Sequence, residues 1–291
     1  MRRWYAPAPP RGTYGSAKSA APDWPASIHR LLGLNVNEIR AVGSTDGLNK
    51  VPEVTFVFWL IKIAATTLGE TGGDAVSMSM NLGYLVGTAI FAVVFAVAVT
   101  AQIRARRFHP LLYWTTIVAT TTVGTTLADF ADRSLGIGYA GGSALLLLLL
   151  LGSLGVWYRT LGSVAVSSVA TPRAEAYYWL TIMFSQTLGT ALGDWTADSM
   201  GLGYVGAAFV FGGLLALVGA AYFRSRVSHT LLFWAAFVLT RPLGAVVGDF
   251  LDKPLAAGGL ALSRYTASAA LLAFMLGAIM LLGQRAARAA H

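Results

Sequence analysis

Residues 59–74 read WLIKIAATTLGETGGD, a run in which an apolar segment acquires threonines, glycines and two carboxylates before it ends. Three further segments of the chain have nearly the same composition. When their tryptophans are aligned as position 0, threonine or proline stands at position 8, glycine at position 10 and aspartate at position 15. The aligned residues are Trp59, Trp114, Trp179 and Trp234; Thr67, Thr122, Thr187 and Pro242; Gly69, Gly124, Gly189 and Gly244; and Asp74, Asp129, Asp194 and Asp249. Agreement of four copies at four positions indicates an internal repeat.

The repeats are themselves arranged in pairs. Their tryptophans are separated by 55, 65 and 55 residues. Residues 104–109, RARRFH, share the pattern Arg-x-Arg-x-x-His with residues 224–229, RSRVSH, which lie 120 residues later. We therefore interpret the chain as a two-repeat unit that has been duplicated.

The composition is that of a membrane protein. Of the 291 residues, 56% are apolar and only 12% are charged, about half the charged fraction of a typical soluble domain. Eight apolar stretches have about the 20 residues that a helix needs to cross a bilayer. These stretches are roughly 54–73, 84–103, 110–128, 139–157, 176–193, 204–222, 230–248 and 265–282. We predict an all-α polytopic membrane protein with eight transmembrane helices, built from four parallel two-helix repeats.

The basic residues predict how these helices are oriented. Sixteen of the twenty-one lysines and arginines fall in the N-terminal segment, in alternate connections or near the C-terminus. Because cytoplasmic loops are enriched in basic residues, we expect both termini to be cytoplasmic in the inner membrane of a bacterium. Residues 1–50, rich in Pro, Gly, Ala and Ser, predict a disordered cytoplasmic tail. The membrane domain then covers 51–291, with repeats at about 51–108, 109–160, 173–228 and 229–288.

The repeated segments resemble a known family. The stretches NKVPEVTFVFWLIKIAATTLGETGGD, HPLLYWTTIVATTTVGTTLADFADRSLGIGY, EAYYWLTIMFSQTLGTALGDWTADSMGLGY and FWAAFVLTRPLGAVVGDFLDKPLAAGGL are similar to the DUF347 repeat of bacterial proteins labelled membrane-anchored. The resemblance covers about residues 49–285 and all four copies. It implies paired helices in a membrane, and it implies no activity.

Polar residues of each first helix are predicted to share one face. Glu70 and Asp74 stand three and seven residues after Thr67, and the other repeats follow the same spacing. Four parallel repeats closed into a ring would gather these side chains around a central path. Rings of carboxylates select cations, and carboxylate and hydroxyl oxygens suit hard monovalent or divalent ions. The predicted ion ligands are Asp74, Asp129, Asp194, Asp249 and Glu70, and the predicted path-lining residues are Thr67, Thr122, Thr125, Thr187 and Thr190.

Two basic residues interrupt the apolar spans and are predicted counter-charges. Lys62 lies on the same helix face as Glu70, which we expect to be its partner. Arg241 is expected to pair with Asp249 or with an acid of another repeat. The tryptophans near the starts of the spans are interpreted as an aromatic belt at the membrane interface.

The predicted function is a transporter or channel for a small inorganic cation, of unspecified identity, with proton coupling as a variant. Crowded carboxylates can also carry protons. The alternative is a structural or sensory membrane scaffold in which each aspartate caps or bridges a helix end. Neither a nucleophile–base set nor a zinc motif stands out and cysteine is absent, so we predict no enzymatic activity and no cofactor. Besides the bilayer and the ion or protons, we predict no nucleic-acid partner, because the topology accounts for the net charge of +8.

Overall fold

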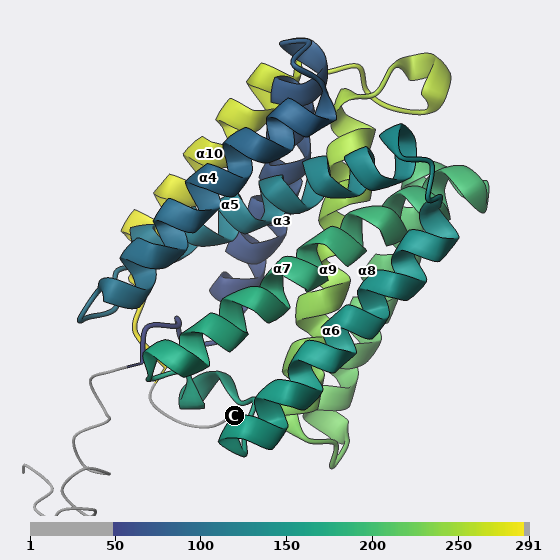
Figure 1. The fold of residues 1–291 in the computed structure, drawn as a ribbon. Helices are drawn as coiled ribbons and strands as arrows, with labels where there is room; N and C mark the ends of the chain where they lie inside the picture. The colour runs from purple at the N-terminus through teal and green to yellow at the C-terminus, as the bar shows by residue number, and fades with distance from the viewer. Residues whose placement is uncertain (1–48, 288–291) are drawn as a thin grey trace, which may run out of the picture. The chain divides into compact units, whose positions relative to one another are not determined.

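The computed structural model describes residues 49–287. The prediction of a disordered tail therefore lies outside the described residues, apart from Asn49 and Lys50. Eight long α-helices make up the described part of the chain (Figure 1). They are α3 (Phe56–Asp74), α4 (Gly83–Arg104), α5 (Pro110–Asp129), α6 (Tyr139–Leu161), α7 (Pro172–Asp194), α8 (Gly203–Arg224), α9 (His229–Asp252) and α10 (Arg264–Leu281). The predicted all-helical fold of four two-helix repeats is confirmed, with one helix for each predicted stretch.

Short helical segments follow several of the long helices. Five-residue π-helical segments at Ala75–Ser79, Phe130–Ser134 and Trp195–Ser199 directly follow α3, α5 and α7, and 3₁₀ turns occupy Val166–Ser168 and Leu255–Ala257. Thr55 and Thr171 accept hydrogen bonds from the backbone N–H groups of Phe58 and Ala174, and so cap the starts of α3 and α7.

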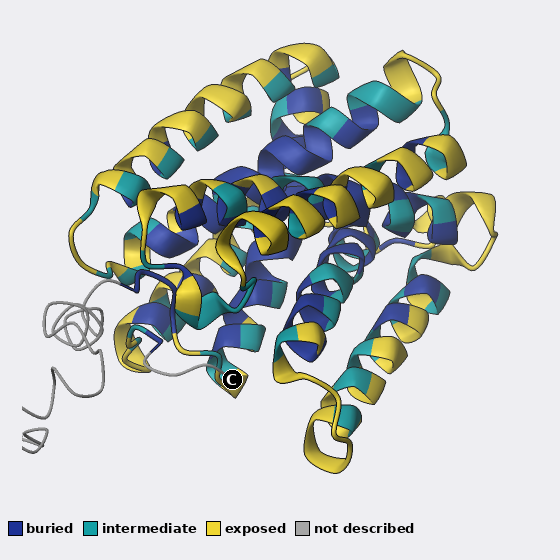
Figure 2. Cartoon of the chain, turned by 60° about the horizontal axis from the view of Figure 1, so that its bottom comes forward, coloured by how far each residue is buried: buried dark blue, intermediate teal, exposed yellow. Residues whose placement is uncertain are grey.

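The first helices of the four repeats form an inner ring. Helix α3 contacts α5, α5 contacts α7, α7 contacts α9, and α9 closes the ring on α3. The second helix of each repeat does not cover its own partner but packs on the first helix of the next repeat, as α4 on α5, α6 on α7, α8 on α9 and α10 on α3. Figure 2 shows burial concentrated on the inner helices and exposure on the outer ones.

Five of the described helices, α4, α6, α8, α9 and α10, are long and apolar enough to cross a membrane. The remaining three, α3, α5 and α7, belong to the inner ring. They carry threonines, glycines and acids on faces that contact protein, which lowers their overall hydrophobicity. A helix surrounded by other helices does not need an apolar surface on every side.

The glycines at position 10 allow the inner helices to approach closely. A methyl group on Gly69 would collide with Thr121, and one on Gly189 would collide with Arg241. At Gly124 it would lie 3.0 Å from Gln186, and at Gly244 it would collide with Thr66. Each glycine therefore packs against the residue at position 7 of the next repeat. The glycine of the fourth repeat packs against the residue at position 7 of the first, which closes the ring. Small residues serve the same purpose in helix packing within membranes.

Aromatic side chains fill one end of the ring, which we call the aromatic end. The aromatic residue before each tryptophan contacts the tryptophan of the next repeat, with ring centroids 5.4–6.3 Å apart. The pairs are Phe58 with Trp114, Tyr113 with Trp179, Tyr178 with Trp234, and Phe233 with Trp59. The prediction of an interfacial tryptophan belt is wrong for three of the four residues. Trp114, Trp179 and Trp234 are 1–4% exposed, because they face neighbouring repeats in the core.

The two ends of the described chain meet at the aromatic end. The backbone N–H of Glu53 donates to the Arg285 carbonyl at 2.8 Å, and that of Ala287 donates to Val51 at 2.9 Å. Lys50 is also packed here: its ammonium donates to three carbonyls at the end of α4 and forms an ion pair with Glu175.

Candidate functional site

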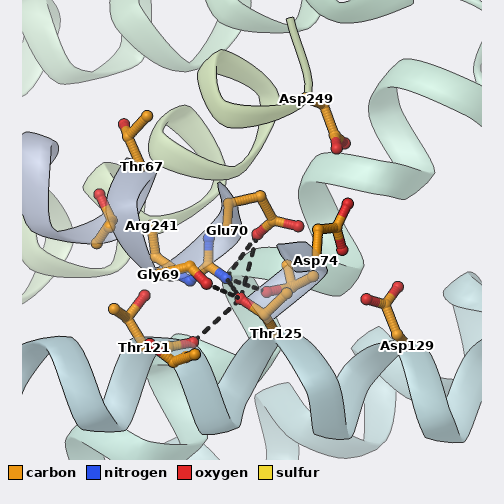
Figure 3. A network of polar contacts seen from close by, with 12 residues as sticks. Thr67, Gly69, Glu70, Asp74, Thr121, Thr125, Asp129, Arg241 and Asp249 are labelled. Atoms are coloured by element: carbon orange, nitrogen blue, oxygen red, sulfur yellow. Dashed lines mark hydrogen bonds and ion pairs between the residues drawn. The ribbon is translucent and has the colours of Figure 1, made fainter. Parts of the chain in front are cut away.

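The aspartates at position 15 lie at the opposite end of the ring, which we call the carboxylate end. In the first three repeats the aspartate is the last residue of its α-helix, and a π-helical segment follows it. All four aspartates are buried, with 2–3% of each residue exposed. Because the four inner helices run side by side, these residues approach one another across the ring. Figure 3 shows the carboxylates of Asp74, Asp129, Asp249 and Glu70 around a shared space.

Two groups of three carboxylates are close enough to share one ion. Glu70, Asp74 and Asp129 each offer an oxygen within 4.8 Å of the others. The same holds for Asp74, Asp249 and Asp252. Asp74 belongs to both groups, so the carboxylates form one continuous cluster rather than separate pairs. All the ligands are hard oxygens, which favour alkali, alkaline-earth or manganese ions over soft metals.

Arg133 bridges two aspartates from adjacent repeats. Its Nε atom lies 2.9 Å from Oδ1 of Asp129, and its Nη2 atom lies 3.1 Å from Oδ2 of Asp194. Arg133 follows Asp129 by four residues, so the first contact is made within one helical segment. The second contact joins the second repeat to the third.

Lys253 makes the equivalent bridge in the other half of the chain. Its ammonium lies 2.9 Å from Asp249 and 2.8 Å from Asp74. Asp249 and Lys253 follow Asp129 and Arg133 by 120 residues, so the two bridges are related by the duplication. Burial acts to lower the pKa of Lys253, but the two carboxylates outweigh it, and the net effect raises the pKa above its ordinary value. Lys253 is therefore charged at any physiological pH.

Arg264 adds a third contact at this end. Its Nε atom lies 2.8 Å from Asp252, and its Nη2 atom lies 3.6 Å from Asp74. Asp252 stands at position 18 of its repeat, as Asp132 does in the second repeat, but Asp132 forms no ion pair within the described residues, and Arg264 has no counterpart of the same type. The fourth repeat therefore enlarges the cluster beyond the fourfold pattern.

Arg241 stands eight residues, about two helical turns, before Asp249 on α9 and therefore lies deeper in the ring than the aspartates. It is fully buried, and its Nη2 atom donates to Glu70 at 2.8 Å and to the hydroxyls of Thr125 and Thr190. Because these partners come from α3, α5 and α7, this one side chain from α9 contacts all the inner helices. Of the two alternatives predicted for Arg241, the acid of another repeat is the one present.

The predicted pairing of Lys62 with Glu70 is wrong, since Glu70 pairs with Arg241. The Lys62 ammonium instead lies 4.1 Å from the centre of the Phe237 ring and 3.4 Å from the Thr240 hydroxyl. Lys62 is completely buried, with no acidic partner among residues 49–287. A cation over an aromatic face is attracted by the ring quadrupole, which compensates in part for lost hydration.

The predicted path-lining threonines divide into two groups. Thr125 and Thr190 point into the ring, where they contact Arg241. The other three lie at position 8 and donate to carbonyls of their own helices four residues earlier: Thr67 to Ile63, Thr122 to Val118 and Thr187 to Met183. All five are buried, and their role in lining a path stays a prediction.

Several polar atoms at the level of Arg241 lack hydrogen-bond partners among the described residues. Within the described part of the chain, the Thr121 hydroxyl, both side-chain polar atoms of Gln186, and Nε and Nη1 of Arg241 have no hydrogen-bond partner. All three residues stand at position 7 of their repeats. Because buried polar groups normally have partners, these atoms indicate a level of the ring suited to water or another polar group.

The acidic cluster contains more acidic than basic side chains. Six buried carboxylates, those of Glu70, Asp74, Asp129, Asp194, Asp249 and Asp252, contact four basic side chains, those of Arg133, Arg241, Lys253 and Arg264. Each carboxylate has a basic neighbour, but four positive charges are shared among six negative ones, so the cluster carries an excess of two negative charges when all groups are ionised. Protons or a bound cation can supply the missing positive charge.

Sequence reasoning missed Arg133, Lys253, Asp252 and Arg264 as members of this site. A signal for two of them was available, because an aspartate is followed four residues later by a basic residue at both 129/133 and 249/253. Asp252 repeats Asp132, which lies 120 residues earlier, but Asp132 forms no ion pair within the described residues, so this repetition does not identify a member of the site; Arg264 follows no repeated pattern. Their places depend on how the connection between α9 and α10 folds back, which the spacing does not determine.

Comparison with protein-family models identifies the repeat. A model described as a Repeat of Unknown Function (DUF347) matches residues 57–108, 112–163, 177–228 and 232–288. Neither the curated proteins nor the solved structures include a significant match to this chain. The four matches cover most of the sequence and coincide with the four inner–outer helix pairs. The chain therefore belongs to the family of proteins built from the DUF347 repeat.

Proposed function

We propose that all eight helices span the cytoplasmic membrane of a bacterium, with both termini on the cytoplasmic side. The five long apolar helices support this, as do the exposed leucines, valines and phenylalanines of the outer ring. The described chain begins and ends at the aromatic end, which is consistent with an even number of spans. The basic connections after α4 and α8 lie at that same end, so the carboxylate end would face outward.

We infer that the acidic cluster binds a small hard cation or protons and moves them across the membrane. The observation that carries this proposal is the convergence of six buried carboxylates with only four basic partners. Ionisable groups buried in a membrane protein are costly and commonly mark ion or proton pathways. The unpartnered polar atoms of Gln186 and Arg241 extend the polar environment inward from the cluster.

The arrangement favours a carrier over an open channel. Arg241 crosses the ring just inside the cluster, and the packed aromatic residues seal the end beyond it. A fixed guanidinium opposes the passage of cations through electrostatic repulsion. In the proposed cycle, a cation enters among the aspartates and competes with Arg133 and Lys253. Its release toward the cytoplasm requires Arg241 to leave Glu70 and the aromatic layer to open. No catalytic role is assigned to any residue.

Ion flux in proteoliposomes tests this proposal. We would measure uptake of Na⁺, K⁺, Mg²⁺, Ca²⁺, Mn²⁺ and protons by the wild type, Asp129→Asn and Asp194→Asn. The matched control is Asp198→Asn, which changes an exposed acid outside the cluster. We expect flux of at least one ion in the wild type and the control, and at least a tenfold loss in both cluster variants. Flux that is unchanged in the variants, or absent from the wild type, would remove the transport proposal.

A non-transporting scaffold is the second candidate, and the bridges made by Arg133 and Lys253 favour it. Each joins aspartates of adjacent repeats and would hold the ring closed. Under this alternative, the aspartate substitutions lower the stability of the protein, and no ion crosses the membrane in any variant.

A further inference from the structure

An apolar groove lies at the aromatic end, between α3, α8 and α9. Its volume is about 410 Å³. The first turns of α3 and α9 form two walls, and the last turns of α8 form the third. Among the residues that line it are Trp59, Ile63, Leu215, Gly219, Phe223 and Phe233. Acidic side chains are absent from the described lining, and the lining side chains that carry a polar group are those of Thr55, Trp59, Ser167, Tyr222, His229 and Thr230.

The duplication explains why this groove is open. In the other half of the chain the corresponding elements are α7, α4 and α5. There, Phe95 and Val99 of α4 pack against the hydrophobic core, and α4 contacts α7. The residues 120 positions later are Leu215 and Gly219, which are smaller, and α8 makes no comparable contact with α3. The groove therefore results from two missing bulky side chains at one of two related positions.

The position and chemistry of the groove identify its occupant. Its wall on α3, residues 56–63, is roughly 11 Å long at 1.5 Å per residue, about a third of the thickness of a bilayer's hydrocarbon core. Arg224 directly follows the lining residue Phe223 as the last residue of α8, and Arg226 lies in the connection between α8 and α9. His229, which also lines the groove, packs against Tyr222 with ring centroids 4.8 Å apart. The apolar wall thus ends beside basic and hydrogen-bonding groups.

We propose that this groove binds a phospholipid with an anionic headgroup from the cytoplasmic leaflet. The acyl chain lies against α3 and α8, and the phosphate lies near Arg224, Arg226 and His229. Basic residues at a membrane surface attract anionic lipids, and apolar burial holds the chain. This inference rests on the proposed membrane location, but it does not depend on ion transport.

Native mass spectrometry of the full chain in mild detergent tests the site. Phosphatidylglycerol and phosphatidylethanolamine are each titrated into the wild type. They are also titrated into the double variant Leu215→Phe/Gly219→Val, which introduces the residue types found at the equivalent positions of α4, Phe95 and Val99. The matched control is Gly213→Val, an exposed glycine of α8 with open space around it. We expect the wild type and the control to bind phosphatidylglycerol at least tenfold more tightly than phosphatidylethanolamine, and the double variant to lose at least tenfold in affinity.

A second variant separates the headgroup from the acyl chain. Arg224→Gln/Arg226→Gln leaves the groove intact, so we expect it to bind both lipids with similar affinity. Melting temperatures close to that of the wild type verify folding of each variant. Equal binding of the two lipids by the wild type, or unchanged binding in the groove-filling variant, overturns the proposal. A wild type that binds neither lipid also overturns it and points to protein as the occupant. A chain that stays soluble without detergent would instead contradict the membrane location itself.

Discussion

The two ends of the inner ring use the repeat in opposite ways. At the aromatic end, all four copies carry the same kind of side chain, and each contacts the next in the same manner around the ring. Inside the carboxylate end, the copies diverge at the positions that face one another. Position 7 carries Thr66, Thr121, Gln186 and Arg241, and position 11 carries Glu70, Thr125, Thr190 and Ala245. The fourfold pattern is therefore kept in the aromatic packing and in the aspartates of position 15, and it is lost at positions 7 and 11, which lie between them.

The two ends are also stabilised by different kinds of interaction: apolar contacts at the aromatic end and buried ion pairs at the carboxylate end. Apolar contacts are non-directional and tolerate substitutions that conserve volume. Buried charges depend on particular partners, and removing one partner leaves the other uncompensated. We therefore expect the two ends to respond differently to comparable substitutions, and the predictions below test this contrast.

The largest effect is expected at Arg241. Replacement by Gln leaves Glu70 buried without its basic partner, which should reduce the free energy of unfolding by about 3–5 kcal/mol. The double variant Glu70→Gln/Arg241→Gln should recover at least half of this loss, because neither charge then remains unpaired. Unfolding in detergent, followed by circular dichroism, measures both. A double variant as unstable as the sum of the single variants would show that the two residues act independently.

A smaller effect on stability is expected from substitution of Gly69, which lies on α3 next to Glu70. Gly69→Ala forces a methyl group into Thr121 and should cost about 1–3 kcal/mol. Gly72→Ala is the matched control, since nothing lies within 4 Å of its added methyl group, and helix propensity should make it neutral or slightly stabilising. Thermal unfolding of the two variants compares them directly. Equal melting temperatures would contradict the close approach of α3 and α5.

Lys253 tests whether a cation can replace a bridging side chain. Lys253→Gln leaves Asp74 and Asp249 without their shared partner and should cost about 1–3 kcal/mol at low divalent-ion concentration. Millimolar Mg²⁺ or Ca²⁺ should restore part of the lost stability, because Asp74, Asp249 and Asp252 have oxygens within 4.8 Å of one another. Melting temperatures with and without the ions provide the measurement. Arg226→Gln, an exposed change, should show no such ion dependence.

The smallest effect is expected at the aromatic end. Tyr113→Phe removes the hydrogen bond between the Tyr113 and Tyr178 hydroxyls, which are 2.6 Å apart, while it conserves the ring. We expect a loss of about 1 kcal/mol in the free energy of unfolding and no change in ion binding. Chemical unfolding and ion titration of this variant check the two parts separately. Altered ion affinity would mean that the two ends are not independent.

Periodicity predicted much of the fold. The tryptophan, glycine and aspartate columns identified four repeats, and helix geometry placed Glu70 and Asp74 on one face. The order of the helices around the ring was not predictable in this way. That α4 covers α5 rather than α3 depends on contacts between repeats, which a repeated spacing does not specify. The same limit explains why Lys62 was assigned to Glu70, since the competing partner, Arg241, lies 171 residues away from Glu70. It also explains why the tryptophans were assigned to the membrane interface, since an amphipathic indole ring suits either an interface or a protein core and the repeated spacing does not distinguish the two.

The most direct measurement of the central claim is the binding of ions to purified protein. Isothermal titration of Na⁺, K⁺, Mg²⁺, Ca²⁺ and Mn²⁺ into the wild type and into Asp129→Asn/Asp194→Asn would compare an intact acidic cluster with one that has lost two carboxylates. We predict saturable binding of at least one of these ions to the wild type and a loss of at least tenfold in affinity in the double variant. If no ion binds the wild type, or if the folded double variant binds as tightly, the buried carboxylates have only a structural role.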